Sequence, residues 1–180
     1  MSGMGLTGRL PAVLCALGMC AGAALAAPPN LDEVQASLRD MGVEATLTLY
    51  FDCKVAEDGT GFEGVATGEP RWVEIAQRLM RGADACQAAS LQAALGLAMR
   101  EAPRVVLPLV GRTARLAPEQ ICLPAIPRDR PVAARLRDLS LSRLAISSVG
   151  DARLADARQA CLDHIAAVEA PLRAAAGASR

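Results

Sequence analysis

The strongest pattern of apolar and polar positions lies between Pro70 and Gly82. Its apolar residues recur at the spacing of one helical face, and they are Trp72, Ile75, Ala76 and Leu79. Charged and amide side chains fill the positions between them, so the opposite face meets water. Pro70 fits the first helical position because the N–H that it lacks has no partner there, and Gly82 fits the residue just past the end. This pattern predicts a helix from residue 71 to 81.

Apolar positions recur at helical spacing along most of the remaining chain. They predict helices at residues 31–41, 88–100, 118–122, 131–146 and 152–170, and a short or kinked helical piece at 105–110. Asn30 is a good N-cap for the first of these, and Pro108 argues against a central strand in the short piece. In the helix at 131–146 we expect four apolar side chains to face inward: Val132, Leu136, Leu139 and Leu144.

Three other segments are less regular. Residues 43–53 fit a strand, because threonines and Tyr50 alternate with leucines and Phe51, but they fit an amphipathic helix almost as well. Since no second segment resembles a strand with which they could pair, we predict a helix. Residues 57–68 are rich in glycine and acidic residues and predict a loop. We expect the alanine-rich end to fray from Pro171.

The composition favours helices over sheets. The chain has one tryptophan, one tyrosine and two phenylalanines, so its core must be built mainly from alanine, leucine and valine. Such side chains suit closely packed helices, whereas a β-sandwich needs more aromatic and β-branched residues. Residues 28–180 are enough for one domain with its own core. We therefore predict a single all-α domain of about six or seven short helices.

Residues 1–27 have the features of a secretory signal peptide. A single charge, Arg9, precedes an apolar run at 10–24, and small residues stand at the expected cleavage site around Ala26. The apolar run is short for a membrane span, and no later segment resembles one. The alternative is that this segment is retained as an N-terminal anchor. We predict export to the periplasm, with residues 28–180 as the mature chain.

Four cysteines follow the predicted cleavage site: Cys53, Cys86, Cys122 and Cys161. An even number of cysteines in an exported chain predicts two disulfides, which three connectivities can satisfy. A zinc site is the weaker alternative, because no two of these cysteines are within four residues of each other.

Five short motifs resemble a known family. They are G-E-P-R-W-V at 68–73, R-G-A-D-A at 81–85, S-L-x-x-A-L at 90–95, A-P-R-V-V-L at 102–107 and I-C-L-P at 121–124. Together they resemble a family of uncharacterised exported proteobacterial helical proteins that share the pattern G-D-P-x-W-L, G-x-D-A, P-x-x-V-L, C-x-x-P. The similarity covers roughly residues 60–165. It implies a helical fold and a Cys122–Cys161 disulfide, which leaves Cys53 to pair with Cys86. Glu69 and Cys86 depart from the family, which commonly has Asp and Gly there.

No arrangement of residues indicates an active site. His164 is the only histidine, beside Asp163 and three residues after Cys161, and it could serve as a general base or ligand. Without a second histidine or a nucleophile motif, we favour a partly exposed helix position. Four acids, Asp52, Glu57, Asp58 and Glu63, could pair as in glycosidases, but a solvated acidic loop is the simpler interpretation. We predict no enzyme, catalytic residue, cofactor or metal.

Charge is distributed unequally along the chain. Residues 28–99 hold five basic and eleven acidic side chains, whereas residues 100–180 hold thirteen and eight. This asymmetry indicates a polar binding surface, unless the two halves fold against each other and their charges pair internally or sit dispersed. We predict that the partner contacts Arg112 and Arg115 in the connector 111–115, and Arg128 and Arg130 in the loop 124–131. The zero net charge and the small number of aromatic residues argue against nucleic acid as the binding partner.

These features favour an exported, non-enzymatic protein that binds another protein. By analogy, a small, exported, disulfide-bonded helical chain is similar to immunity proteins of the Rap1a/Tai group, although the spacing of the motifs differs. An immunity or inhibitor role is therefore one form of the hypothesis. The alternative is an envelope accessory protein that contacts peptidoglycan or anionic lipid through the same arginines. An enzyme with an unrecognised site is the least favoured hypothesis.

Overall fold

The computed structural model describes residues 29–53 and 60–178, and within them it contains helices but no strand. The helices are α1 (Leu31–Asp40), α2 (Gly42–Tyr50), α3 (Thr60–Ala66), α4 (Pro70–Leu79), α5 (Ala85–Glu101), α6 (Pro103–Val106), α7 (Pro118–Ile121), α8 (Val132–Ser147) and α9 (Ala155–Ala178). Three short 3-10 turns lie between them: η1 (Leu107–Leu109), η2 (Ala114–Leu116) and η3 (Ala152–Leu154). The prediction of an all-α fold with two disulfides is confirmed. The predicted signal peptide lies outside the described residues.

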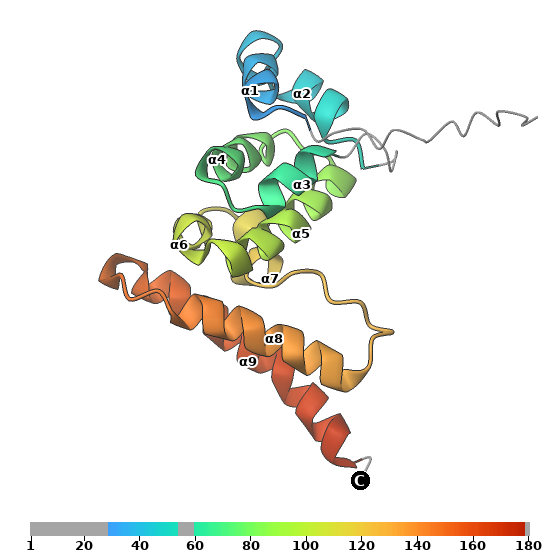
Figure 1. Ribbon diagram of the computed structural model, residues 1–180, viewed down its shortest axis with the longest axis vertical. Helices are drawn as coiled ribbons and strands as arrows, with labels where there is room; N and C mark the ends of the chain where they lie inside the picture. The colour runs from blue at the N-terminus through green and yellow to red at the C-terminus, as the bar shows by residue number, and fades with distance from the viewer. Residues whose placement is uncertain (1–28, 54–59, 179–180) are drawn as a thin grey trace, which may run out of the picture.

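The helices are stacked along one long axis (Figure 1). At one end α1 packs against α2, and at the other end α8 and α9 lie side by side as a helical hairpin. Between these ends α5 contacts α3, α4, α6, α7 and α8. Because α5 contacts so many other helices, it is the central element of the core. No helix in the described part of the chain is both long and apolar enough to span a bilayer.

Side chains and prolines at the helix starts explain where several helices begin. Asn30 accepts a hydrogen bond from the N–H of Asp32 at 3.0 Å, and Pro70 takes the first position of α4, as predicted. Asp84 and Gln87 form a reciprocal capping box, so α5 begins at residue 85 rather than at the predicted residue 88. Glu69 precedes α4 without a side-chain cap.

Residues 43–50 are helical, which confirms the choice of helix over strand. Thr46 donates its hydroxyl to the carbonyl oxygen of Gly42 at 2.8 Å, and Thr48 donates to that of Glu44 at 3.0 Å. Thr46 is also 2.8 Å from the hydroxyl of Ser37 in α1, and this buried polar contact joins the two helices. The threonines that indicated a strand therefore find hydrogen-bond partners within and beside a helix.

The predicted loop at 57–68 is wrong for residues 60–66, which form α3. Its glycines allow close packing against aromatic rings. A Cβ atom on Gly64 would lie 2.4 Å from a ring carbon of Trp72, and one on Gly61 would lie 2.6 Å from a ring carbon of Phe51. Tertiary packing thus overrides the low helix propensity of glycine here. Residues 57–59 lie outside the described residues.

The two disulfides join segments that are distant in the sequence. Cys53, just after α2, pairs with Cys86 in the first turn of α5, and Cys122, just after α7, pairs with Cys161 in α9. This is the connectivity that the family resemblance implied. The second disulfide is buried and connects the α8–α9 hairpin to the helices around α5. Both bonds indicate folding in an oxidising environment outside the cytosol.

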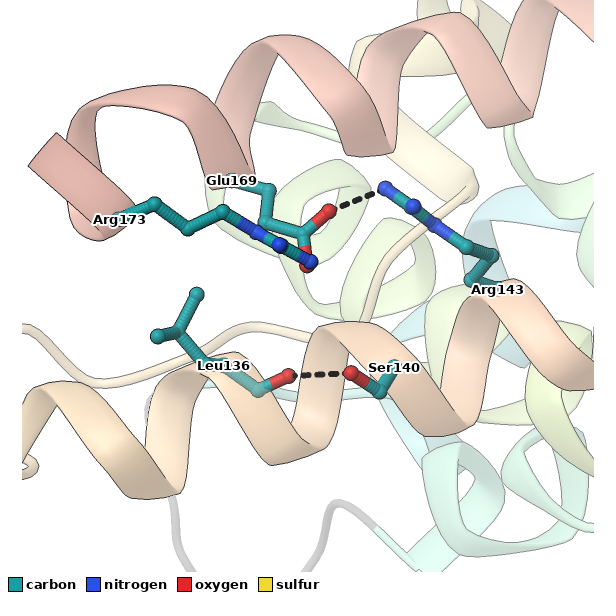
Figure 2. A network of polar contacts seen from close by, with 5 residues as sticks. All are labelled: Leu136, Ser140, Arg143, Glu169 and Arg173. Atoms are coloured by element: carbon teal, nitrogen blue, oxygen red, sulfur yellow. Dashed lines mark hydrogen bonds and ion pairs between the residues drawn. The ribbon is translucent and has the colours of Figure 1, made fainter.

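The hairpin is also held by a charged network (Figure 2). The carboxylate of Glu169 in α9 is buried, and it accepts hydrogen bonds from Arg143 in α8 and from Arg173 one turn further along α9. Pro171 lies inside α9, and the helix continues past it to Ala178, so the predicted fraying from Pro171 is wrong. Buried Leu172 and the bond between Arg173 and Glu169 hold these last turns.

Candidate functional site

A cleft lies between the C-terminal half of α4 and residues 112–116, and we call it the α4 cleft. Its volume is about 720 Å³. Its charged lining residues are four arginines and one glutamate: Arg78, Arg81, Arg112, Arg115 and Glu74. Guanidinium groups bind carboxylates and phosphates with two parallel hydrogen bonds. The cleft therefore has the chemistry of an anion-binding surface.

The connector at 111–115 has a defined conformation on one side of this cleft. Gly111 adopts φ +78°, which favours glycine, and its N–H donates to the carbonyl oxygen of Leu116 at 2.8 Å. The side chain of Leu116 is buried, and Gln92 of α5 donates to the carbonyl oxygen of Arg115 at 2.8 Å. The side chains of residues 112–115 are exposed, as the sequence predicted for this segment.

Arg115 holds the connector against α4. One terminal nitrogen of its guanidinium donates to the carbonyl oxygens of Met80 and Ala83, each at 2.8 Å. The carbonyls after the last turn of a helix lack intrahelical donors, and a cation is favourable there. Arg115 therefore has a structural role within the cleft. Its predicted contact with a partner stays a prediction.

The other three arginines of the cleft keep more of their donors available. The Nε of Arg112 donates to the carbonyl oxygen of Pro108 at 2.6 Å, and its two terminal nitrogens form no hydrogen bond with a described residue. The guanidinium groups of Arg78 and Arg81 form no hydrogen bond or ion pair with any other residue that the structure describes, and both side chains are exposed. Sequence reasoning placed Arg78 and Arg81 on the polar face of a helix but could not show that the connector lies beside them.

The remaining two predicted contacts lie elsewhere. Arg130 pairs with Asp138 of α8 at 2.5 Å, and Arg128 lines a second groove, which we call the α9 groove. This groove has a volume of about 480 Å³ and lies between α5, α7, the loop 123–128, α8 and α9. The structure thus brings Arg112 and Arg115 together and separates them from Arg128 and Arg130.

The ion pairs among the described residues do not join the acidic half of the chain to the basic half. Every ion pair found among residues 29–53 and 60–178 joins two residues of the same half. Arg71 pairs with Asp32 at 2.5 Å in the first half, and the other pairs lie within residues 100–178. Among the described residues, the two halves therefore form no ion pair with each other, and dispersed charges stay the alternative to a binding surface.

The described residues considered for catalysis come from different elements. His164 lines the α9 groove and is half-buried, and Glu63 is exposed on α3. Asp52 follows α2, while Glu57 and Asp58 lie outside the described residues. Within the described parts of the chain, no group of three or more histidine, cysteine, aspartate or glutamate side chains is placed to hold a metal ion.

Among the described residues, one carboxylate has a clearly shifted pKa. Asp151 caps the start of η3 and accepts hydrogen bonds from the side chain and the backbone N–H of Arg153. The side-chain bond is the largest cause, and together they lower the pKa of Asp151 from 3.8 to about 2. The same pair raises the pKa of Arg153. This is a helix cap on the surface, so the shift concerns stability rather than catalysis.

Comparison of the chain with protein-family models, with curated proteins and with solved structures finds no match. Function therefore has to be argued from the clefts themselves.

Proposed function

We propose that this protein is an exported, non-enzymatic binding protein that holds an acidic surface of another protein in the α4 cleft. The observation that carries the proposal is the group of four arginines around one glutamate, where Arg78 and Arg81 have no acidic partner among the described residues. The guanidiniums of such a group repel one another in the isolated protein, and an anionic partner reduces this repulsion.

Periplasmic localisation is part of the same proposal. It rests on the features of residues 1–27 in the sequence and on the two disulfides, which favour an oxidising compartment. An immunity or inhibitor role is the specific form of protein binding that we propose, since a small domain with an arginine-lined cleft suits the blocking of another protein's surface.

Charge reversal in the cleft tests the proposal. The double variant Arg81→Glu, Arg112→Glu replaces two guanidiniums that no described residue needs for an ion pair. The matched control is Arg39→Glu, Arg137→Glu, which changes the net charge equally at exposed positions on α1 and α8. Each tagged mature protein would be used to capture partners from an envelope extract of the cells that make it, at low and at moderate salt.

We expect one stoichiometric protein partner with the wild type and with the control, and a loss of at least about tenfold in affinity with the cleft variant. Binding should weaken as salt rises, because the Debye length falls to about 10 Å at 0.1 M. Unchanged binding by the cleft variant would refute the proposal. Cleft-dependent sedimentation with peptidoglycan or anionic vesicles, without a protein partner, would instead support the envelope accessory role.

A further inference from the structure

The α9 groove has a different chemistry from the α4 cleft, and the two share no lining residue. The chain between α7 and α8 swings away from the helices before it enters α8 (Figure 1). Four apolar side chains with buried or half-buried surfaces form part of the groove: Leu123, Ile126, Val168 and Leu172. An apolar wall of this kind suits a hydrocarbon chain rather than a fully hydrated ion.

A basic group lies at the edge of this apolar wall. Arg135 of α8 lines the groove, its Nε is enclosed by protein, and that nitrogen has no hydrogen-bond partner among the described residues. The guanidinium forms no ion pair with any described residue either. A buried donor without an acceptor is costly, so native proteins normally supply a partner. The Nε is too enclosed for a ligand to reach, so an anion in the groove would instead meet the terminal nitrogens of Arg135, which also have no hydrogen-bond partner among the described residues.

Two further donors line the same groove. Arg128 enters from the loop and His164 from α9, while one glutamate, Glu119, lies among the lining residues. Arg128 lies in the loop and Arg135 in α8, so a carboxylate between them would accept hydrogen bonds from both sides. The volume of about 480 Å³ is within the usual range of about 300–1,000 Å³ for small-molecule sites.

We infer that the α9 groove binds a small amphiphilic carboxylate, whose charged end meets Arg135 and Arg128 and whose hydrocarbon chain packs against Ile126, Val168 and Leu172. The inference rests on two guanidiniums beside an apolar wall, those of Arg135 and Arg128, neither of which forms an ion pair with a described residue. It is independent of protein binding in the α4 cleft, because neither site uses a residue of the other.

The test uses the only histidine of the chain as a reporter. Decanoate, below its micelle concentration, is titrated into the full mature protein while the ring resonances of His164 are followed by NMR, and the affinity is measured in parallel by calorimetry. Acetate and decanol are the matched probes, because each keeps only one half of the amphiphile. We expect a saturable shift with decanoate and binding at least about tenfold weaker with acetate or decanol.

Variants separate the site from unspecific binding. Arg135→Gln should weaken decanoate binding at least about tenfold, whereas Arg137→Gln, an exposed arginine on the same helix, should bind as the wild type does. If Arg135→Gln does not fold, Arg128→Gln replaces it, since that side chain is exposed. Absence of a saturable shift, equal binding of decanol, or equal weakening in the Arg137 variant would overturn the inference.

Discussion

The charged network in the α8–α9 hairpin predicts an unequal response to mutation (Figure 2). The side chain of Glu169 is 6% exposed, whereas those of Arg143 and Arg173 are 40% and 66% exposed. Water can therefore hydrate the arginines fully when the glutamate is removed, but it hydrates the carboxylate only in part when the arginines are removed. Removing the single anion should cost less than removing the two cations.

The expected magnitudes follow from this difference in exposure. Glu169→Gln keeps one acceptor oxygen and leaves two hydrated cations, so we expect the free energy of unfolding to fall by about 1 kcal/mol. Arg143→Gln with Arg173→Gln leaves a buried carboxylate without a cation, a change that typically costs about 3–5 kcal/mol. We expect about 3 kcal/mol, because part of the site is open to water.

Urea denaturation followed by circular dichroism measures these losses, since all of the helices contribute to the signal. The triple variant, which lacks the carboxylate and both guanidiniums, should recover most of the loss of the double arginine variant. Arg137→Gln, an exposed arginine of α8, is the control and should be close to neutral. A cost of Glu169→Gln equal to that of the arginine pair, or no recovery in the triple variant, would show that packing rather than charge holds the hairpin.

Three further predictions concern packing, the buried disulfide and pH. Gly64→Ala should lower the free energy of unfolding by about 1–2 kcal/mol, because the added Cβ would meet a tryptophan ring. Gly177→Ala, with open space around the added Cβ, should be neutral or stabilising. Urea denaturation followed by tryptophan fluorescence compares the two variants. Replacing Cys122 and Cys161 by serine opens a link across 39 residues and should cost about 4 kcal/mol of stability in the same assay. Asp151→Asn should be less stable than the wild type above pH 4, and the difference should vanish as the pH falls through about 2, because a carboxylate with a lowered pKa stabilises the fold only while ionised. Denaturation between pH 2 and 6 measures that difference.

Most helices could be predicted because their signals are local. The apolar spacing in α4 and the N-cap of α1 depend on residues within a few positions of each other, and both were correct. The exceptions depend on distant contacts. α3 forms because Gly64 lies against Trp72, and no local pattern in a glycine-rich segment shows that a ring will pack there. The last turns of α9 persist because Arg173 binds Glu169. The expectation that a helix ends at an internal proline takes no account of such a contact.

One misassigned residue shows the limit of periodicity within a correctly predicted helix. Leu144 was expected to face inward but is 70% exposed, whereas Leu139 and Ile146 are fully buried. Positions 139 and 144 are five apart, which turns the side chain by about 140° around the helix and off the buried face. The buried face continues through Ser142 and Ile146 instead.

The candidate site was predictable only in part, because it is assembled from separate segments. The sequence singled out Arg112 and Arg115 by their position in a basic connector, and it passed over Arg78 and Arg81, which look like ordinary solvent-facing positions of a helix. Their importance arises from the contact of Arg115 with the end of α4, across more than thirty residues of sequence. The groove around Arg135 was missed for the same reason.

The zero net charge of the chain conceals an uneven distribution in the fold. Exposed acids gather on α1 and α2 at one end of the stack, among them Glu33, Asp40 and Glu44, and the arginines of the α4 cleft lie next to the middle helices. No ion pair among the described residues joins the two halves, so these acids and the cleft arginines do not neutralise each other by direct contact. A partner with an acidic face would be attracted at the cleft and repelled at the α1–α2 end, so its orientation would be selected before contact. Electrostatic steering of this kind is expected to depend on salt even in a protein whose charges sum to zero.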